Sequence, residues 1–253
     1  MRINFIRAFR VWQRHWTVHT KLYKSSFALN FAEPVLYLVA FGMGLGVYVT
    51  EINGMPYIRF IAPGIIASSS VFAAVYECSY GTYVRMEFQR TFDAILATPV
   101  GINDLVAGEL LWGATKSVIY GASITLVVVL FGLVDSFAVI LVIPVIFLGG
   151  IIFAELSLIF AALVPGIDSF SYFFTLFMTP LFLFSGIFFP LDVLPHMVGK
   201  IASFTPLYHL VTACRGLAAG ALAGILLNVF WLAAMALLLA PFPFRLMRKR
   251  VIH

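Results

Sequence analysis

Long apolar runs alternate with short polar interruptions along almost the whole chain. An apolar run of about twenty residues is long enough to cross the hydrocarbon core of a bilayer as a helix. Six runs reach this length, and we expect each to form a membrane span, so that the fold class is an all-α membrane protein. The predicted spans are 27–48, 58–80, 105–131, 137–164, 170–188 and 221–242.

The first 26 residues show a different pattern, in which aromatic and basic residues take opposite faces of a helix. Spacings of four, three and four place the aromatic residues on one stripe. Such a helix lies in the headgroup region of a membrane, with aromatic side chains towards the lipid tails and arginines towards anionic lipid. We expect an amphipathic interface helix over 1–26, and a soluble helix packed on a neighbour is the alternative. The stripe is Phe5, Phe9, Trp12 and Trp16, and the opposite face carries Arg7, Arg10 and Arg14.

The composition agrees with a membrane protein. Of the 253 residues, 62% are hydrophobic and 11% are charged, whereas soluble domains are about half apolar and about a quarter charged. Six of the sixteen lysines and arginines lie in residues 1–26, and four lie in 245–250. Basic clusters beside spans stay in the cytoplasm, so we expect both termini there, in agreement with an even number of spans. The basic charge does not indicate nucleic-acid binding, because no soluble basic face accompanies it.

This topology assigns each connection to a side of the membrane. Connections 49–57 and 133–136 are external and contain no lysine or arginine, and 165–169 is cytoplasmic. The external segment 189–220 is too long for a turn, and its prolines argue against a single span. We expect two short re-entrant helices there, with their ends covered by neighbouring spans.

The cytoplasmic connection 83–103 is amphipathic. Apolar residues recur along one helical stripe, and charged residues form the opposite face. Pro99 ends this helix, and Asn103 with Asp104 can cap the start of the third span. The pattern indicates a docking element for a soluble partner, and an interfacial helix that only anchors its loop is the alternative. The stripe consists of Phe88, Phe92, Ile95 and Leu96, and the polar face consists of Glu87, Arg90 and Asp93.

Four stretches carry a family resemblance: "EPVLYLVAFGMGLG" in the first span, "FIAPGI" in the second, "EFQRTFDAILATPVGINDLVAGEL" after it, and "SGIFFPLDVLPHMVGKIASFTPLYHLVTACRG" late in the chain. Together they resemble the membrane subunit of an ABC-2 type exporter, and within that family they are most similar to nodulation-factor exporter permeases. The late stretch is the most specific. It carries Pro206, Leu207, His209 and Arg215 at the family spacing, while Phe184 departs from the family pattern.

The resemblance implies a single ABC-2 type transmembrane domain over 1–253, in a homodimer or heterodimer in the bacterial inner membrane. Each copy would bind a cytoplasmic ATPase subunit that carries ATP and Mg²⁺, so this chain would be a transporter subunit, with no catalytic residue, cofactor or metal of its own. Glycines 42, 44 and 46 would allow a close helix contact between the two copies. The segment 86–98 would correspond to the coupling helix. The implied ATPase-coupling residues are Arg85, Glu87, Phe88, Arg90, Phe92 and Asp93.

Several ionisable residues fall inside predicted spans. A charge at the bilayer centre costs about 2.5–3.5 kcal/mol, so each should face protein or water. We favour an ion pair of Lys116 with Glu155 or Glu33, and a contact with a negatively charged substrate is the alternative. Arg215 is a candidate for attracting an anionic group on the outer side, and rings of the phenylalanine-rich fifth span could stack on sugars. The candidate substrate path is therefore Lys116, Glu155, Phe173, Phe177 and Arg215.

The function expected from these observations is ATP-driven export of an amphipathic substrate, such as a lipid-linked or acylated oligosaccharide. A drug or small-molecule efflux permease of the same family is one alternative. Another is an ion-coupled secondary transporter that uses Glu33, Lys116 and Glu155 as a proton relay. The stretch "GELLWGATKS" is not a phosphate-binding loop, because Lys116 follows Gly113 by three residues instead of one.

Overall fold

The computed structural model describes the backbone of residues 3–49, 51–52 and 54–251, and the side chains of these residues except 22–30. The described chain is almost entirely helical, apart from two short strands that pair antiparallel, β1 (Glu51–Ile52) and β2 (Met55–Pro56). The α-helices are α1 (Phe5–Val39), α2 (Tyr57–Tyr76), α3 (Thr91–Leu96), α4 (Ile102–Leu130), α5 (Val142–Leu163), α6 (Ser169–Tyr172), α7 (Thr179–Leu183), α8 (His196–Ser203), α9 (Pro206–Ala219), α10 (Ile225–Leu239) and α11 (Pro241–Val251).

Short π-helical and 3-10 segments extend several of these helices. The π-helical segments continue α1, α2 and α6, and the 3-10 segments follow the α1 extension, precede α5 and precede α8. The π-helical segments are Ala40–Gly44, Glu77–Gly81, Val84–Phe88 and Phe173–Met178, and the 3-10 segments are Leu45–Val47, Phe137–Leu141 and Leu191–Val193.

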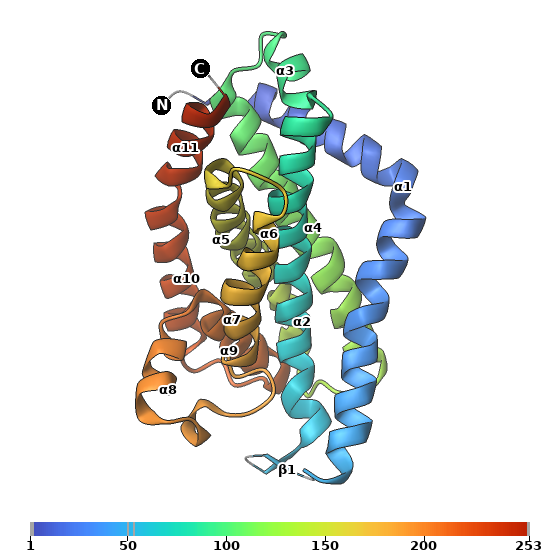
Figure 1. Cartoon of the computed structure of the whole chain (residues 1–253). Helices are drawn as coiled ribbons and strands as arrows, with labels where there is room; N and C mark the ends of the chain where they lie inside the picture. The colour runs from blue at the N-terminus through green and yellow to red at the C-terminus, as the bar shows by residue number, and fades with distance from the viewer. Residues whose placement is uncertain (1–2, 50, 53, 252–253) are drawn as a thin grey trace.

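The helices form an elongated bundle with two distinct ends. The start of α1, the end of α11 and the short helix α3 lie together at one end, while β1 and α8 lie at the other (Figure 1). The placement of α3 beside both chain ends agrees with the predicted topology, in which the termini and the 83–103 connection share one side of the membrane.

Four helical stretches in the described chain are long and apolar enough to cross a bilayer: Tyr57–Phe88, Ile102–Leu130, Phe137–Leu163 and Ile225–Val251. Two shorter apolar helices, Phe31–Val47 and Ser169–Leu183, coincide with the predicted first and fifth spans. The helix that contains the predicted second span, 58–80, continues to Phe88. Its polar residues Glu77 and Arg85 form an ion pair at 2.6 Å, so charge does not require the helix to leave the bundle there.

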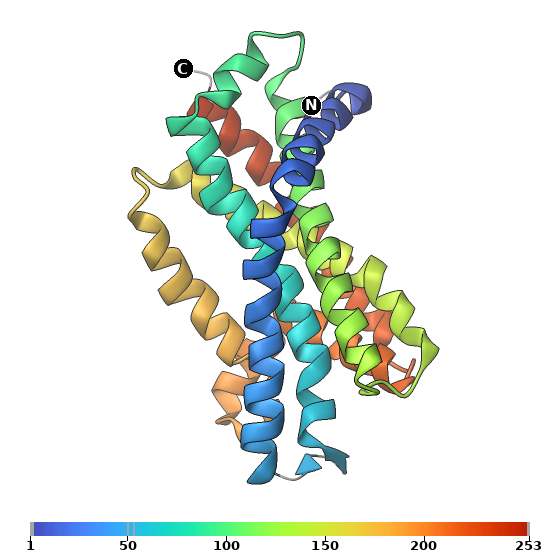
Figure 2. The same ribbon diagram turned by 90° about the vertical axis from the view of Figure 1, so that its right-hand side faces the viewer.

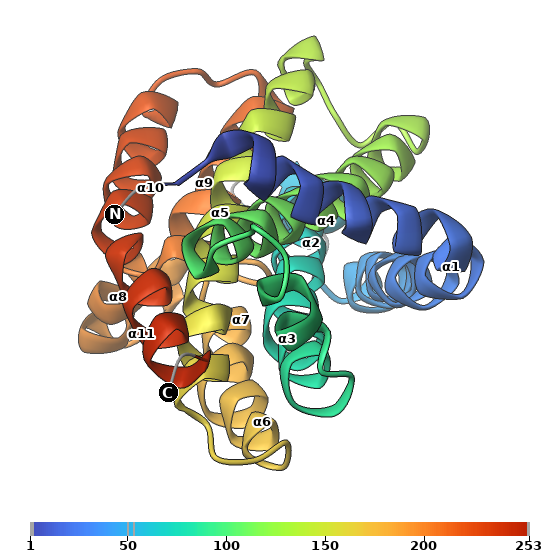
Figure 3. The same ribbon diagram turned by 90° about the horizontal axis from the view of Figure 1, so that it is seen from above.

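The predicted interface helix and first span are parts of one helix, α1. Its N-terminal part crosses over α4 at the end of the bundle (Figure 3), and the ribbon then bends so that the rest runs alongside α2 (Figure 2). Asn4 caps the helix by accepting from Ile6 N at 3.1 Å. The backbone N–H of Asn4 donates to Asp104 Oδ1 at 2.7 Å, which links the starts of α1 and α4.

The face of α1 that packs on the bundle is not the aromatic stripe. Ala8, Val11 and His15 are buried, whereas Phe5, Phe9 and Trp16 are exposed. An interface helix must expose its aromatic rings so that they can enter the lipid. The remaining member of the stripe, Trp12, donates from Nε1 to Thr115 Oγ1 on α4 at 2.9 Å. The face with Ala8, Val11 and His15 packs on neighbouring helices, as the alternative prediction for this segment has it.

Glycines allow α4 to approach three neighbours closely. A Cβ at Gly108 would lie 2.6 Å from Val11 Cβ of α1, a Cβ at Gly113 would overlap Cys78 and lie 2.8 Å from Ala154 Cβ of α5, and a Cβ at Gly121 would lie 2.9 Å from Ser70 Cβ of α2. Small residues let helix backbones pack tightly inside a membrane. By contrast, glycines 44 and 46, predicted to lie at a contact between copies, face open space, and a Cβ at residue 42 would meet Ile58 of the same chain.

The close approach at Gly113 gives a stability prediction. Gly113→Ala should lower the midpoint of thermal unfolding in detergent by several degrees, because overpacking a tight core costs about 1–3 kcal/mol. Gly166→Ala is the control, since its new methyl group meets no atom within 4 Å and the residue lies outside the predicted contact between copies. Equal midpoints for the two variants would contradict the proposed packing.

Candidate functional site

A network of ion pairs lies inside the bundle, near the end that carries α3. Arg85 donates from Nη1 to Glu77 Oε1 at 2.6 Å and from Nη2 to Glu109 Oε2 at 2.7 Å. Lys116 Nζ lies 3.5 Å from Glu77 Oε2, and His15 Nε2 lies 2.8 Å from Glu109 Oε1. Thr82 donates its hydroxyl to Glu109 Oε2 at 3.0 Å.

This network joins three helices that are distant in sequence. His15 comes from α1, Glu77 and Arg85 come from the extension of α2, and Glu109 comes from α4. The Glu109 side chain is 1% exposed and that of Arg85 is 12% exposed. The charges of Glu77 and Glu109 are balanced by those of Arg85 and Lys116. Buried charges require such pairing, because moving an ion out of water costs several kcal/mol even after the protein relaxes.

The partner predicted for Lys116 was wrong. The structure pairs Lys116 with Glu77 and places its ammonium 5.5 Å from the ring centroids of Trp112 and Tyr120. The sequence favoured Glu155 or Glu33 because all lie in predicted spans. Which of these acids meets Lys116 depends on the rotation of each helix about its axis, which hydropathy does not fix.

The 83–103 connection forms a short helix at the end of the bundle. This helix, α3, begins at Thr91. The preceding residue, Arg90, has a φ of 50°, and the chain reverses there after the α2 extension. Phe92 is 1% exposed and packs with Tyr83 and Met86 in one apolar cluster, together with residues of α4 and α5. Asp104 closes the connection, accepting from Gly101 N at 3.1 Å. The helix α3 is therefore attached firmly to the bundle by its apolar side.

The six predicted coupling residues divide into two groups. Arg85 and Phe92 point into the bundle, Arg85 into the ion network and Phe92 into the apolar cluster. The others lie at or near the surface, where Arg90 and Asp93 form an exposed pair at 3.6 Å and Glu87 accepts from Arg250 of α11 at 3.0 Å. Phe88 belongs to the predicted apolar stripe together with Phe92, but its side chain is 65% exposed, because the α2 helix extends to this residue and sets its direction.

A shallow groove lies between this helix and α1. It encloses about 390 Å³ and is lined by Arg10, Arg14, Gln89, Ile95 and neighbouring residues. Its lining combines two guanidinium groups with an apolar floor, and it adjoins the exposed face of α3. The groove and the exposed face together form one continuous surface at this end of the molecule.

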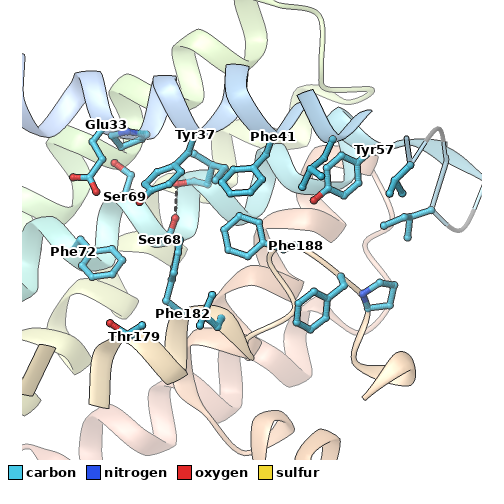
Figure 4. A pocket seen from close by; sticks show the side chains of 18 of the residues that line it. Glu33, Tyr37, Phe41, Tyr57, Ser68, Ser69, Phe72, Thr179, Phe182 and Phe188 are labelled. Carbon is cyan, nitrogen blue, oxygen red and sulfur yellow. Dashed lines mark hydrogen bonds between the residues drawn. The ribbon is translucent and has the colours of Figure 1, made fainter. Parts of the chain in front are cut away.

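A large cavity lies between the second part of α1, α2 and the helix of residues 169–183, with a volume of about 1020 Å³. Aromatic rings supply much of its wall. Phe41 of α1 meets Phe188 with ring centroids 5.0 Å apart, and Phe182 of α7 meets Phe72 of α2 at 5.5 Å. Glu33 and Ser69 lie at one end of the cavity in Figure 4, and Tyr37, Phe41 and Phe188 extend away from them. This volume and lining suit an elongated amphiphile.

None of the predicted path residues lines this cavity. Lys116 belongs to the ion network, and Glu155 lies on α5 with 2% of its surface exposed. Phe173 is buried against Phe160 at a centroid distance of 4.4 Å, and Phe177 stacks on Phe173 at 5.4 Å. The fifth predicted span does contribute aromatic residues to the cavity, but from other positions on the helix. The described chain also shows no ion pair among Glu33, Lys116 and Glu155, the three residues of the predicted proton relay.

Arg215, the fifth predicted path residue, has a structural role. It donates to Phe60 O from Nε and Nη2 at 3.3 and 3.2 Å, donates from Nη2 to Gly186 O at 2.8 Å, and stacks 3.9 Å from the Phe60 ring centroid. These contacts fasten α9 to the start of α2. His209 fastens the same helix to α10, with Nδ1 2.7 Å from Asn228 Oδ1 and its ring 4.2 Å from that of Trp231.

The other motif residues position α9 as well. Pro206 occupies the first turn, the Thr205 hydroxyl accepts from Tyr208 N at 3.4 Å, and Leu207 is fully buried. The most specific part of the family resemblance is thus a set of anchors for one helix. Within 189–220, α8 and α9 are the two α-helices of the described chain.

Sequence reasoning missed His15 and the cavity. One signal for His15 was present, because Ala8, Val11 and His15 follow each other at helical spacing and so share a face. No comparable signal exists for the cavity, since its walls come from three segments whose contacts are tertiary. Glu77 and Glu109 lie inside the predicted spans 58–80 and 105–131, where a charge is costly. Their shared partner Arg85 was predicted to be a coupling residue on the cytoplasmic side.

The ion network gives a second stability prediction. Glu109→Gln should destabilise the fold by about 3–5 kcal/mol, because Arg85 keeps its charge but loses a buried carboxylate. Glu87→Gln is the control and should cost less than about 1 kcal/mol, since the Glu87 to Arg250 pair is partly exposed. Thermal unfolding in detergent measures both losses of stability. Equal losses would show that the buried network stabilises the fold no more than the partly exposed pair does.

Comparison with known proteins assigns the chain to a family. Residues 7–218 match the family model described as ABC-2 type transporter. The chain is 38% identical to Nodulation protein J of Sinorhizobium fredii over 81% of this chain and 78% of that protein, and 39% identical to Nodulation protein J of Rhizobium leguminosarum bv. viciae over 81% and 79%. It is 24% identical to the inner membrane transport permease YadH of Escherichia coli over 71% and 70%.

These similarities confirm the resemblance to nodulation-factor exporter permeases. The four helices long enough to cross a bilayer agree with a protein that spans the membrane several times. The chain is a multi-pass membrane permease that belongs to the ABC-2 type transporter family.

Proposed function

We propose that this chain is the permease subunit of an ATP-driven exporter that moves an amphipathic substrate, such as a lipid-linked or acylated oligosaccharide, out of the cytoplasm. The observation that carries the proposal is the attachment of α3. This helix has a charged outer face, and its apolar side packs in the cluster of Phe92, Tyr83 and Met86 directly beside the ion network. A soluble motor that grips α3 therefore moves the helices of the bundle with it.

Six spans with both termini in the cytoplasm complete the proposed topology. The first and fifth spans are the shorter apolar helices Phe31–Val47 and Ser169–Leu183. The basic residues near both chain ends, including Arg10 and Arg248, favour a cytoplasmic position for the end that carries α3. In a bacterial cell this membrane is the inner membrane. The external side then carries β1, β2 and the segment 189–220, with α8 and α9 entering the outer leaflet.

The ATPase subunit holds ATP and Mg²⁺, and it docks on the surface formed by α3 and the adjoining groove. Its proposed contacts are Asp93 of α3, Arg90 directly before α3 and Phe88 at the end of the α2 extension. Arg10 and Arg14 extend the surface onto α1. Motion of α3 passes to α2 through Phe92 and to α1 and α4 through the ion network. Rigid packing transmits displacement because packed interfaces move as units.

The cavity between α1, α2 and the 169–183 helix is the proposed substrate path. Its aromatic wall offers apolar contact to acyl chains and flat faces to sugar rings. A permease of this family acts as a dimer in our proposal, so two copies of the cavity line the passage. A drug efflux permease would use the same cavity, and transport assays separate these substrates. No observation favours the ion-coupled alternative, whose three relay residues occupy separate places in the bundle.

Inverting the charges on α3 tests the proposed coupling surface. The double variant Arg90→Asp with Asp93→Arg keeps an opposite-charge pair on the helix, and aspartate tolerates the left-handed backbone at residue 90. We expect at least a tenfold loss of the co-purified ATPase subunit, since like charges then oppose each other across the interface. Membrane insertion should persist.

Inversion of an exposed pair near the far end of α2 provides the control. Arg59 and Asp135 lie 2.7 Å apart, and Arg59→Asp with Asp135→Arg should leave the ATPase bound. Retention of the ATPase and of ATP-driven transport by the α3 variant would refute the assigned surface.

A further inference from the structure

The cavity is lined by very few charged side chains. Among the described residues that line it, Glu33 is the one charged side chain, and lysine, arginine and histidine do not contribute to the lining. The two cations of the predicted substrate path do not line the cavity. Lys116 pairs with Glu77, and Arg215 donates to backbone carbonyls. The field inside the cavity is therefore set by a carboxylate, which accepts hydrogen bonds and cannot donate them while ionised.

The carboxylate and two of the lining hydroxyls lie at the same end of the cavity. Figure 4 shows Glu33, Ser69 and Thr179 towards one end, with Phe41 and Phe188 further along. The Thr179 hydroxyl already donates to Phe174 O at 3.0 Å. Ser69 is different, because its buried Oγ has no hydrogen-bond partner among the described residues. This atom exposes almost no surface, so a ligand reaches it only after the Ser69 side chain turns into the cavity. A ligand that then bonds to it satisfies a hydroxyl that is costly to leave buried without a partner.

Aromatic rings line the rest of the cavity, and Tyr57 is the labelled residue farthest from Glu33 (Figure 4). Phe182 lies within ring contact of Tyr37, Phe72 and Phe188, at centroid distances of 6.3, 5.5 and 5.1 Å. It thus joins α1, α2 and the chain after α7 across the cavity wall. An alkyl or acyl chain fits along these rings, while a head group reaches the carboxylate and the serine. The two ends separate head from tail within one cavity.

We propose that Glu33 selects the head group of the transported amphiphile. The cavity accepts heads that carry hydrogen-bond donors and no negative charge, such as amines and sugar hydroxyls, and it disfavours phosphate and carboxylate heads. This inference rests on the proposed transport function and narrows its substrate class. It runs against the alternative role of Lys116 and the candidate role of Arg215, both of which involve an anionic group of the substrate.

Binding of matched probes tests the selection. The protein is reconstituted in phosphatidylcholine nanodiscs without its ATPase, and three amphiphiles with the same dansyl-labelled dodecyl chain are titrated by fluorescence anisotropy. Their heads are a primary ammonium, a glucosyl group and a phosphate. We expect the ammonium probe to bind at least about tenfold more tightly than the phosphate probe, as one charge-assisted hydrogen bond allows. The glucosyl probe, with neutral donors, should fall between them.

Variants separate head recognition from tail recognition. Glu33→Gln should bring the ammonium and phosphate affinities within about threefold of each other, and Glu33→Asp should keep the wild-type order. Phe182→Ala should weaken all three probes by a similar factor, because Phe182 meets the chain and not the head. Glu51→Gln is the control for loss of an acidic residue, since Glu51 lies in β1 outside the cavity lining.

The outcomes distinguish this inference from the proposed function. Tighter binding of the phosphate probe, or an equal effect of Glu33→Gln on all three probes, overturns the selection by Glu33 while the cavity still holds amphiphiles. Failure of the wild-type protein to bind any probe removes the cavity as an amphiphile site, and the substrate part of the proposed function falls with the inference.

Discussion

Charges within a membrane-spanning bundle must be neutralised, and the rest of this structure depends on how that is done. Glu77 and Glu109 share Arg85, and Lys116 completes a balance of two acids and two bases. An isolated charge would oppose membrane insertion, whereas a paired set can stay inside. Because the pairs cross between helices, they also fix the rotation of each helix. The extension of α2 to Phe88 and the position of α3 follow from that arrangement.

The bundle keeps its buried charges apart from its cavity. The ion network lies beside α3, where α1, α2 and α4 meet, while the cavity lies along the second part of α1 and is mostly aromatic. Each charge of the network has a partner of opposite charge on another residue, which suits transmission of movement. The cavity has one carboxylate and one hydroxyl without a partner, which suits recognition of a mobile ligand. Glu33 and Glu109 thus act in different ways because their neighbours differ.

The sequence predicted the elements well and their contacts poorly. Each of the six predicted spans coincides with an apolar helix, four of them long enough to cross a bilayer, and the amphipathic 83–103 connection contains a short helix at the end of the bundle where both chain ends lie. Helix ends were less accurate, because Arg85 looks like a cytoplasmic residue until its partners Glu77 and Glu109 are known. The motif around Pro206 identified the family, but only the structure explains why Arg215 is there. Pairings and cavity walls depend on the relative rotation of helices, and periodicity within one helix does not determine that rotation.

The central claim is that force comes from a separate ATPase and enters the bundle through α3. The most direct measurement is transport of a labelled amphiphile in proteoliposomes that contain the permease alone, the permease with its ATPase, and both with ATP and Mg²⁺. Our account predicts transport only in the complete mixture. Transport by the permease alone, driven by an ion gradient and independent of nucleotide, would contradict it.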